Sequence, residues 1–325
     1  MAKEMLTLPA FEEASEIVDK VTYRTKLIYS DFLSNQSGNK VYLKAENMQM
    51  TGAYKLRGAY YKTSTLSPEE RNKGLITASA GNHAQGVALA GKMMGIKTVI
   101  CMPASAPKVK VESTQKLGAE VVLVDGVYDD AYQKALDLQE EFGYTFVHPF
   151  NDEKVIEGQG TIAYEILEEL PETDVIVCAV GGGGLVAGIS SVAKQIKPDI
   201  KVYGVQTIGA LSMYASFAKQ YVTRLNTVKT FADGIAVKEV GNITYDYTKK
   251  YVDDILVVQE EEILDAIKML MTKEKIVSEG AGAAPLGAIL NNYVPNIESK
   301  NVVCVISGGN IDIDTLSKII LLGLD

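Results

Sequence analysis

The sequence predicts an α/β protein of two domains, each built on an open, twisted parallel sheet, and three observations lead to this expectation. The chain has 325 residues, a length more typical of two domains than of one. Short β-branched runs alternate with helical patterns of about 10–15 residues, as expected for right-handed βαβ units. The alternation stops near residue 146 and resumes at residue 174, which indicates two separate series.

The expected elements follow one another in a regular order. Strands are predicted at 41–45, 75–78, 97–102, 119–124, 174–179, 201–206 and 301–306, and helices at 56–66, 82–94, 107–117, 128–142, 185–196 and in a region from 260 onward. The segment Ser67-Pro68-Glu69-Glu70 marks another helix start, because it combines an N-cap serine, a proline at the first helical position and a glutamate at the third. We expect a small domain at 47–146, inserted into a larger domain formed by 1–46 and 147–325.

Composition and charge exclude several classes of protein. The net charge of −9 argues against a nucleic-acid partner. No apolar run approaches the ~18 residues of a membrane span, and the first ten residues lack the apolar core of a signal peptide, so we expect a cytoplasmic protein. Cys101, Cys178 and Cys304 each lie within a β-branched run. They are expected to be buried strand residues, not disulfide or zinc ligands.

Three loops that follow predicted strands carry unusual residues, and ligands of parallel sheets bind at this edge. The loop 79–83 opens a helix, so its backbone N–H groups suit a carboxylate; a tight turn capped by Asn82 is the alternative. The four glycines at 181–184 suit a phosphate monoester, with a flexible turn as the alternative. They match neither the P-loop nor the dinucleotide pattern. The loop 307–310 follows the final strand and brings a serine hydroxyl to the same edge.

Lys55 lies just inside a predicted helix start. A cation is disfavoured there by the helix dipole. A buried amine with a lowered pKa would react with a carbonyl group, whereas a solvated surface lysine is the alternative that the residue alone leaves open.

Together these features resemble the fold-type-II, tryptophan-synthase-β-like pyridoxal-phosphate enzymes, and among them the threonine/serine dehydratases, or threonine ammonia-lyases. The resemblance spans nearly the whole chain. Six segments occur in the family's order, at 51–59, 79–83, 181–184, 233–237, 278–283 and 307–310. One departure is visible, since Ala53-Tyr54-Lys55 replaces the family's usual Ser-Phe-Lys and lacks that serine hydroxyl.

The resemblance implies pyridoxal 5′-phosphate as cofactor and assigns a role to each segment. Lys55 and Ser307 would act in catalysis, Lys55 by holding the cofactor covalently and Ser307 by meeting the pyridine nitrogen. The cofactor phosphate is assigned to Gly181, Gly182, Gly183 and Gly184. The ring is assigned to Tyr54, Asn82, Gly234 and Glu279, with Asn82 at its 3′-oxygen. The substrate carboxylate is assigned to Ser79, Ala80, Gly81, Asn82 and His83.

The implied reaction removes water and ammonia from L-threonine to give 2-oxobutanoate, and from L-serine to give pyruvate. The freed amine of Lys55 would take the α-proton. The alternatives are a serine racemase, another lyase or synthase of this family such as threonine synthase, and a non-catalytic sensor, which would lack Lys55. Ala80 occupies the position where racemase relatives carry a proton-donating serine, which favours elimination.

Three further expectations concern metals, assembly and regulation. No Asp or Glu occurs from 200 to 217, where racemase-like relatives place carboxylates, so no divalent metal is expected. The resemblance implies a homodimer or a homotetramer acting on a small amino acid. The chain ends at Asp325, soon after the loop 307–310. This predicts the short, catabolic type, without a regulatory domain and without inhibition by isoleucine.

Overall fold

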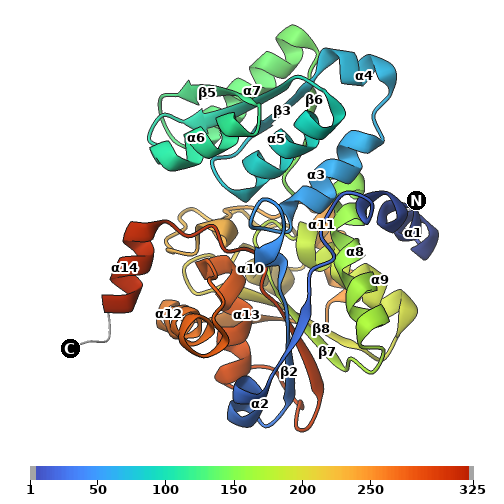
Figure 1. Ribbon diagram of the computed structural model, residues 1–325, viewed down its shortest axis with the longest axis vertical. Helices are drawn as coiled ribbons and strands as arrows, with labels where there is room; N and C mark the ends of the chain where they lie inside the picture. The colour runs from blue at the N-terminus through green and yellow to red at the C-terminus, as the bar shows by residue number, and fades with distance from the viewer. Residues whose placement is uncertain (1–4, 322–325) are drawn as a thin grey trace.

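Two sheets organise the computed structural model, which describes residues 5–321. The larger has six strands in the order β1-β2-β10-β7-β8-β9, and the smaller has four in the order β5-β4-β3-β6. Figure 1 shows the smaller sheet with its helices above the larger one. The strands of the larger sheet are β1 (Leu27–Ser30), β2 (Lys40–Lys44), β7 (Val175–Ala179), β8 (Lys201–Thr207), β9 (Asp254–Val258) and β10 (Asn301–Val305). Those of the smaller are β3 (Leu75–Ala78), β4 (Thr98–Pro103), β5 (Glu120–Val124) and β6 (Thr145–Phe146).

The strand pairing confirms the predicted parallel sheets with one exception. Strand β1 pairs antiparallel with β2, with Leu27 opposite Lys44. All other strand pairs in the described part of the chain are parallel. The helix between these two strands, α2 (Asp31–Ser37), is short, and an antiparallel edge strand on a parallel sheet is common. The prediction also lacked β1, β6 and β9.

The larger sheet is buried on both faces, which explains its continuous apolar strands. Val175 and Val177 of β7 pack with α12 (Glu260–Met269) and α13 (Gly280–Leu290) in one core cluster. Ile176 and Cys178 point to the other face, against α8 (Glu153–Glu169) and α9 (Gly184–Ile196). Successive residues of a strand point to opposite faces, so a strand covered on both sides needs apolar residues throughout.

The smaller sheet has the same construction. Leu75 and Ile100 pack with α5 (Asn82–Met94), whereas Ile76 and Val99 pack with α7 (Tyr128–Phe142). A capping box at Ser67 and Glu70 starts α4 (Pro68–Lys73), as predicted. All three cysteines are free and buried, also as predicted.

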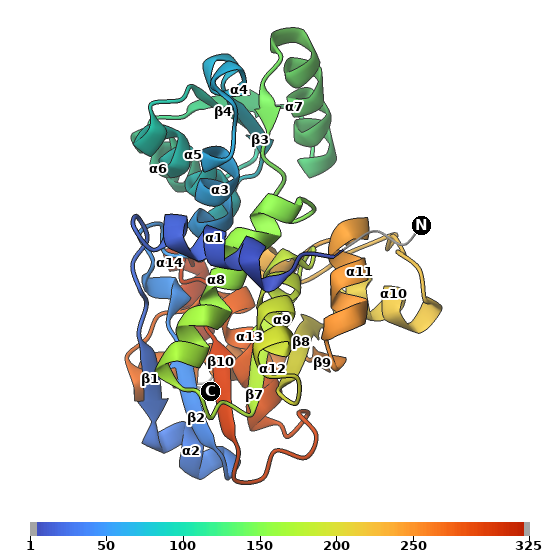
Figure 2. The same cartoon turned by 90° about the vertical axis from the view of Figure 1, so that its right-hand side faces the viewer.

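Helix α3 (Lys55–Ser64) lies where the two parts of the molecule meet. It packs against α5 of the smaller part and against α8 of the larger part, and Figure 2 shows α3 and α8 at this junction. The close approach needs glycine, since a Cβ atom on Gly58 would lie 2.7 Å from the carbonyl oxygen of Val155. Lys55, the first residue of α3, is thereby fixed at the boundary between the two sheets.

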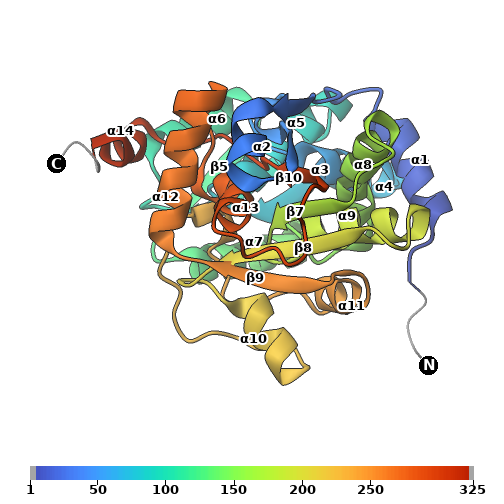
Figure 3. The same cartoon turned by 90° about the horizontal axis from the view of Figure 1, so that it is seen from below.

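The remaining elements cover the edges and connect the layers. They are α1 (Leu8–Val18), η1 (Glu46–Met48), α6 (Lys108–Lys116), α10 (Ser212–Lys219), η2 (Asp233–Ile235), α11 (Asn242–Tyr251), the π-helix η3 (Leu270–Glu274) and α14 (Ile313–Leu321). Helix α14 extends from the side of the larger sheet near α12 (Figure 3). Residues 1–4 and 322–325, the ends of the predicted large domain, lie outside the described residues.

Two features are absent from residues 5–321. No helix there has the length and apolar character needed to cross a membrane. In the same residues, no group of three or more His, Cys, Asp or Glu side chains has an arrangement suited to a metal ion.

Candidate active site

One large cavity lies between the two sheets, at the ends of their strands. It measures about 1620 Å³. Every residue given a role from the sequence lines it, namely Tyr54, Lys55, Ser79, Ala80, Gly81, Asn82, His83, Gly181, Gly182, Gly183, Gly184, Gly234, Glu279 and Ser307. The fold therefore brings six separate segments of the chain to one place, and their individual roles stay predictions.

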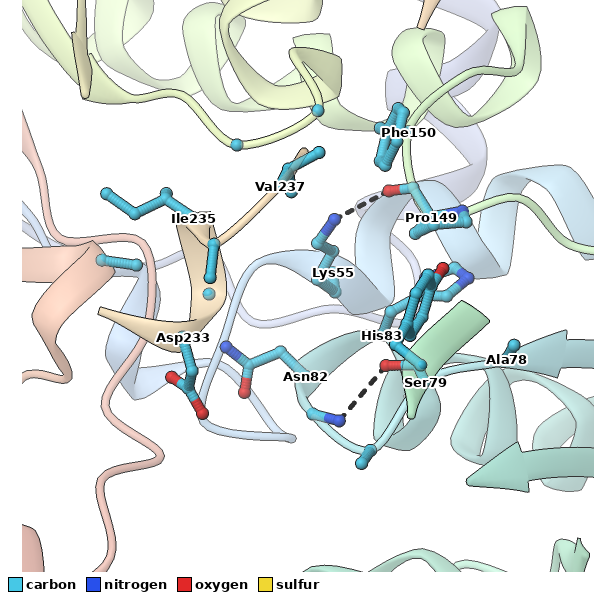
Figure 4. Close-up of a pocket in the computed structure, with 18 of the residues that line it drawn as sticks. Lys55, Ala78, Ser79, Asn82, His83, Pro149, Phe150, Asp233, Ile235 and Val237 are labelled. Atoms are coloured by element: carbon cyan, nitrogen blue, oxygen red, sulfur yellow. Dashed lines mark hydrogen bonds between the residues drawn. The ribbon is translucent and has the colours of Figure 1, made fainter. Parts of the chain in front are cut away.

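Lys55 presents an amine to this cavity, and no carboxylate among residues 5–321 forms an ion pair with it. Its Nζ donates a hydrogen bond of 2.7 Å to the carbonyl of Pro149 and lies 5.3 Å from the centre of the Tyr54 ring. Figure 4 shows the amine directed at Pro149. Burial disfavours the ammonium form and lowers the pKa of Lys55 to about 8, with partial opposition from the charge of Glu279. At pH 7 an amine with this pKa is unprotonated in about one molecule in ten, a far larger fraction than for an ordinary lysine, and this fraction can act as a nucleophile or base.

A pairing of two loops holds Lys55 against the end of β10. Ala53 and Gly308 form an antiparallel bridge. The N–H of Tyr54 donates to the carbonyl of Ser307, at 3.1 Å. Ser307 lies two residues beyond the end of the buried strand β10, so the lysine segment and the final serine loop are fixed relative to each other.

The asparagine loop leads from β3 into α5. The Oγ of Ser79 accepts the N–H of Gly81 at 3.2 Å, which fixes the turn (Figure 4). Asn82 is the first residue of the helix, so the first N–H groups of α5 have no partner within the helix. These groups and the helix dipole favour an anion such as a carboxylate.

The side chain of Asn82 connects the two parts of the molecule. Its Nδ2 donates to Oε1 of Glu279 at 2.7 Å, and its Oδ1 accepts from Nδ2 of Asn310, also at 2.7 Å. Burial, with the nearby negative charge of Asp233, raises the pKa of Glu279 to about 7, although the hydrogen bond from Asn82 opposes this shift. A Glu279 carboxyl with this pKa can hold or release a proton near neutral pH.

The ring of His83, which the resemblance assigned to the substrate carboxylate, is held by a backbone contact. Its Nε2 contacts the carbonyl of Val147 at 2.8 Å. Burial, followed by the charge of Lys55, lowers the pKa of His83 to about 3. The ring is therefore neutral, and its proton on Nε2 is inferred from the carbonyl that faces it.

The glycine loop joins β7 to α9 and has the shape of an anion cradle. A Cβ atom on Gly182 would lie 2.2 Å from the Phe150 ring, and Gly183 has a φ of +98°. The carbonyl of Gly182 is bound by Oγ1 of Thr244 at 2.6 Å. The N–H of Gly183 in the same trans peptide therefore points the opposite way. Together with the open N–H groups of α9, this arrangement suits a phosphate group.

Sequence reasoning missed the segment 147–151, which passes directly through the site. Pro149 contacts Lys55, and Phe150 packs on the glycine loop. The segment follows β6, which has only two residues. A strand this short has no recognisable alternation, so nothing in the sequence marked 147–151 as a loop at a strand end.

Comparison with known proteins places this site in a family. A family profile described as pyridoxal-phosphate dependent enzyme matches residues 18–308. The chain belongs to this family, and its architecture is that of the fold-type-II members.

The similar proteins have consistent names. The chain is 50% identical over 320 residues to an L-threonine ammonia-lyase of Thermotoga maritima, covering 98% of this chain and 79% of that protein. It is 44% identical over 325 residues to a catabolic L-threonine dehydratase of Staphylococcus aureus, covering 99% and 94%. Threonine deaminase isoform 2 of Solanum lycopersicum superposes with a TM-score of 0.93 at 38% identity, covering 99% and 95%. Maize serine racemase superposes equally well, at 0.93 and 34% identity, covering 99% and 98%.

The cavity fits the cofactor of this family. A free amine at Lys55 can bind an aldehyde, and the glycine cradle at 181–184 can hold a phosphate that bears no metal. Asn82, Glu279 and Ser307 supply polar groups between these two points. Pyridoxal 5′-phosphate is thus the cofactor, with Lys55 and the glycine loop as the residues that would hold it.

Proposed function

We propose that the chain catalyses the deamination of L-threonine to 2-oxobutanoate and ammonia, and of L-serine to pyruvate, by elimination of the β-hydroxyl group. The observation that carries the proposal is the amine of Lys55, which has a lowered pKa and faces both the asparagine loop and the glycine loop in one cavity. The names of the relatives, L-threonine ammonia-lyase and L-threonine dehydratase, support this choice of reaction.

Each segment of the site has a task in this reaction. The N–H groups at the start of α5 hold the substrate carboxylate, because they form an anion site beside Lys55. Lys55 removes the proton from the substrate α-carbon, and the cofactor, when bound, withdraws the electrons left on that carbon. The glycine loop fixes the cofactor phosphate. The cavity walls limit the access of water until the β-hydroxyl has left.

A substrate panel tests the proposed reaction. The purified, cofactor-loaded protein is incubated with L-threonine, L-serine, D-serine and L-homoserine, and the release of 2-oxo acid is measured. We expect product from L-threonine and L-serine only. Absence of 2-oxo acid from both, in a protein that carries its cofactor, would exclude the proposal.

Serine racemisation is the second candidate, favoured by the superposition on maize serine racemase. A racemase needs a proton donor on the substrate face opposite the lysine. Ala80 lines the cavity in the asparagine loop, and its methyl group cannot donate a proton. Ser79 also lines the cavity, but its Oγ accepts the N–H of Gly81, which holds the hydroxyl group in the turn of its own loop. We therefore expect elimination to dominate, with the D-serine and pyruvate formed from L-serine as the measurement and Ala80→Ser as the variant that gains some racemisation.

Domain division, assembly and location complete the proposal. We assign residues 47–146 to a small domain and the rest to a large one, supported by the separate sheets of β3–β6 and of the other strands. A homodimer or homotetramer is supported by the exposed apolar side chains of Tyr23, Met48 and Val277. Three free cysteines support a reducing, cytoplasmic compartment. Light scattering of the purified chain measures the assembly.

A further inference from the structure

Three residues of the segment 147–151 contact three different parts of the site. The carbonyl of Val147 faces Nε2 of His83, and the carbonyl of Pro149 accepts the amine of Lys55. The ring of Phe150 covers Gly182 of the glycine loop. We call this segment the strap. It runs between the small sheet and α8, so it relates the lysine, the asparagine loop and the glycine loop to one another.

Asn151 anchors the end of the strap in the larger part of the molecule. Its Oδ1 accepts the N–H of Ile243 at 2.9 Å, and its Nδ2 donates to Oδ1 of Asn242 at 2.8 Å. Both partners belong to the first turn of α11. The position of the Pro149 carbonyl therefore depends on how the chain turns between Val147 and this anchor.

His148 closes that turn from within. Its Nδ1 accepts two backbone N–H groups, from Phe150 at 3.2 Å and from Asn151 at 2.8 Å. This is the bonding of an Asx turn, in which an asparagine or aspartate oxygen binds the backbone two residues on. The ring also lies edge-on to Phe150, with centroids 4.7 Å apart. An Nδ1 that accepts two N–H groups carries no proton, so the imidazole acts here as a turn-closing acceptor.

We propose that His148 is a positioning residue for Lys55: by closing the strap turn it aims the Pro149 carbonyl at the lysine amine and holds that amine in place whenever it is not bound to the cofactor. The elimination requires the released amine to stay beside the substrate α-carbon, and a carbonyl acceptor provides a fixed position that leaves the nitrogen lone pair available. The proposal rests on the proposed function only in taking Lys55 as the reacting amine.

The electrostatic surroundings agree with a neutral role for His148. Burial, then the charge of Lys55, lowers the pKa of His148 to about 4, against a weaker effect of Asp152. The charged and titratable groups that act on Lys55 and its neighbours are Glu279 at the start of α13, His83 in α5 and His148 in the strap. Replacing a neutral His148 by a neutral side chain thus changes the hydrogen bonding around Lys55 without changing the charge.

Three substitutions of His148 distinguish a role in positioning Lys55 from a role in folding alone. His148→Asn keeps an acceptor at the δ1 position and should preserve the turn. His148→Gln moves the acceptor one bond further out, and His148→Leu removes it. Circular dichroism and thermal unfolding of the full-length chain identify which variants are folded. If His148→Leu does not fold, the comparison of Asn with Gln carries the test.

The first measurement determines the pKa of Lys55, in the full-length chain from which the cofactor has been removed. The rate at which acetic anhydride modifies Lys55 is followed against pH by mass spectrometry. We expect an apparent pKa near 8 for the native chain, consistent with the lowered pKa of Lys55. His148→Asn should match it. Loss of the carbonyl acceptor destabilises the ammonium form, so His148→Leu and His148→Gln should lower the pKa by roughly one unit.

The second measurement uses the cofactor-loaded enzyme with L-threonine deuterated at the α-carbon. A misplaced base slows proton removal, so His148→Leu and His148→Gln should lower kcat about 10-fold and raise the isotope effect on kcat, with KM changed less than about 3-fold. Folded Leu and Gln variants with the native Lys55 pKa and the native isotope effect would overturn the proposal. The labelling measurement does not require turnover of threonine. It therefore still tests the role of His148 if the proposed function fails.

Discussion

The first turn of helix α3 carries two cations with opposite surroundings. Arg57 is fully buried and binds Glu46 and Glu165 at 2.8 and 2.6 Å, and Lys44 also pairs with Glu165. Two cations thus face two carboxylates in the core beneath the helix. Lys55, two residues earlier, has no ion-pair partner among residues 5–321 and binds only a carbonyl. One face of α3 therefore anchors the helix, whereas the other presents a reactive amine.

Arg57 and Lys55 differ because burial has a different net effect on the pKa of a cation that has a carboxylate partner and of one that has none. The adjacent carboxylates raise the pKa of Arg57 even though burial acts to lower it. At Lys55 burial prevails, and the pKa falls to about 8. A paired buried cation is fixed and inert, and an unpaired one is available for chemistry. The anchor also explains how an unpaired amine keeps its position, because the helix below it is held by the buried network.

Removal of the reactive amine should have the largest effect. Lys55→Ala leaves the Arg57 network intact, so the chain should fold. It removes both the group that would hold the cofactor and the base, so turnover of L-threonine should fall by roughly 10³-fold or more. Unfolding curves and 2-oxo acid release are the measurements. A folded Lys55→Ala variant with near-native turnover would contradict the account of this face.

Removal of the anchor should act on stability. Arg57→Met leaves Glu46 and Glu165 with one cation between them, and breaking a buried pair in this way costs about 3–5 kcal/mol of unfolding free energy. Arg24→Met is the matched control, since Arg24 pairs with Glu168 while both are largely exposed, and its loss should cost no more than about 1 kcal/mol. Urea unfolding measures both. Equal losses would mean that burial does not distinguish the two arginines.

Glu279 is the carboxylate counterpart of Lys55, because it too is buried and no cation of residues 5–321 is bonded to it. Its folded-state pKa of about 7 lies above the ordinary glutamate value of 4.5, so the stability it contributes is present below pH 4.5 and lost as pH rises through 7. Glu279→Gln keeps an acceptor for Asn82 and removes this penalty. The variant should match the native chain at pH 4 and exceed its stability at pH 8 by up to about 3 kcal/mol, measured by urea unfolding without cofactor. If Glu279→Gln is less stable than the native chain at pH 8, the surroundings of Glu279 stabilise its charged carboxylate and the burial penalty is absent.

The smallest effect is expected from ion pairs across the cavity mouth. Lys110 of α6 contacts Asp233 of η2 at 2.7 Å, and Asp233 is mostly exposed. Pairs of this kind contribute little and are screened by salt. Lys110→Gln should change KM for L-threonine by less than about 3-fold, and the difference should vanish at 1 M salt. A larger change that persists at high salt would indicate that Lys110 contacts the substrate.

The sequence predicted the elements that carry the site better than the elements around it. The bounds of α5 and α7 matched the prediction, because each is bordered by glycine or by a loop of small and polar residues. Strands β1, β6 and β9 were missed: β1 and β6 are short, and β9 lies at a sheet edge and follows a helix with little pattern. All residues given roles do meet in one cavity.

What the sequence could not predict depends on tertiary contacts. The resemblance identified Lys55, but its hydrogen bond to Pro149 joins residues 94 positions apart. The pairing of Arg57 with Glu165 spans 108 positions. Neither interaction leaves a local pattern, since each depends on how α3 packs on the larger part of the molecule. The different behaviour of the two faces of α3 is thus visible only in the fold.

The central claim is that Lys55 is the one amine that holds the cofactor. Reduction of the cofactor-loaded protein with borohydride fixes the bond between the cofactor aldehyde and its lysine, and peptide mass spectrometry then locates the label. The account predicts a single labelled peptide that contains Lys55, and no label in Lys55→Ala. A stoichiometric label on any other lysine, Lys44 and Lys110 included, would contradict it.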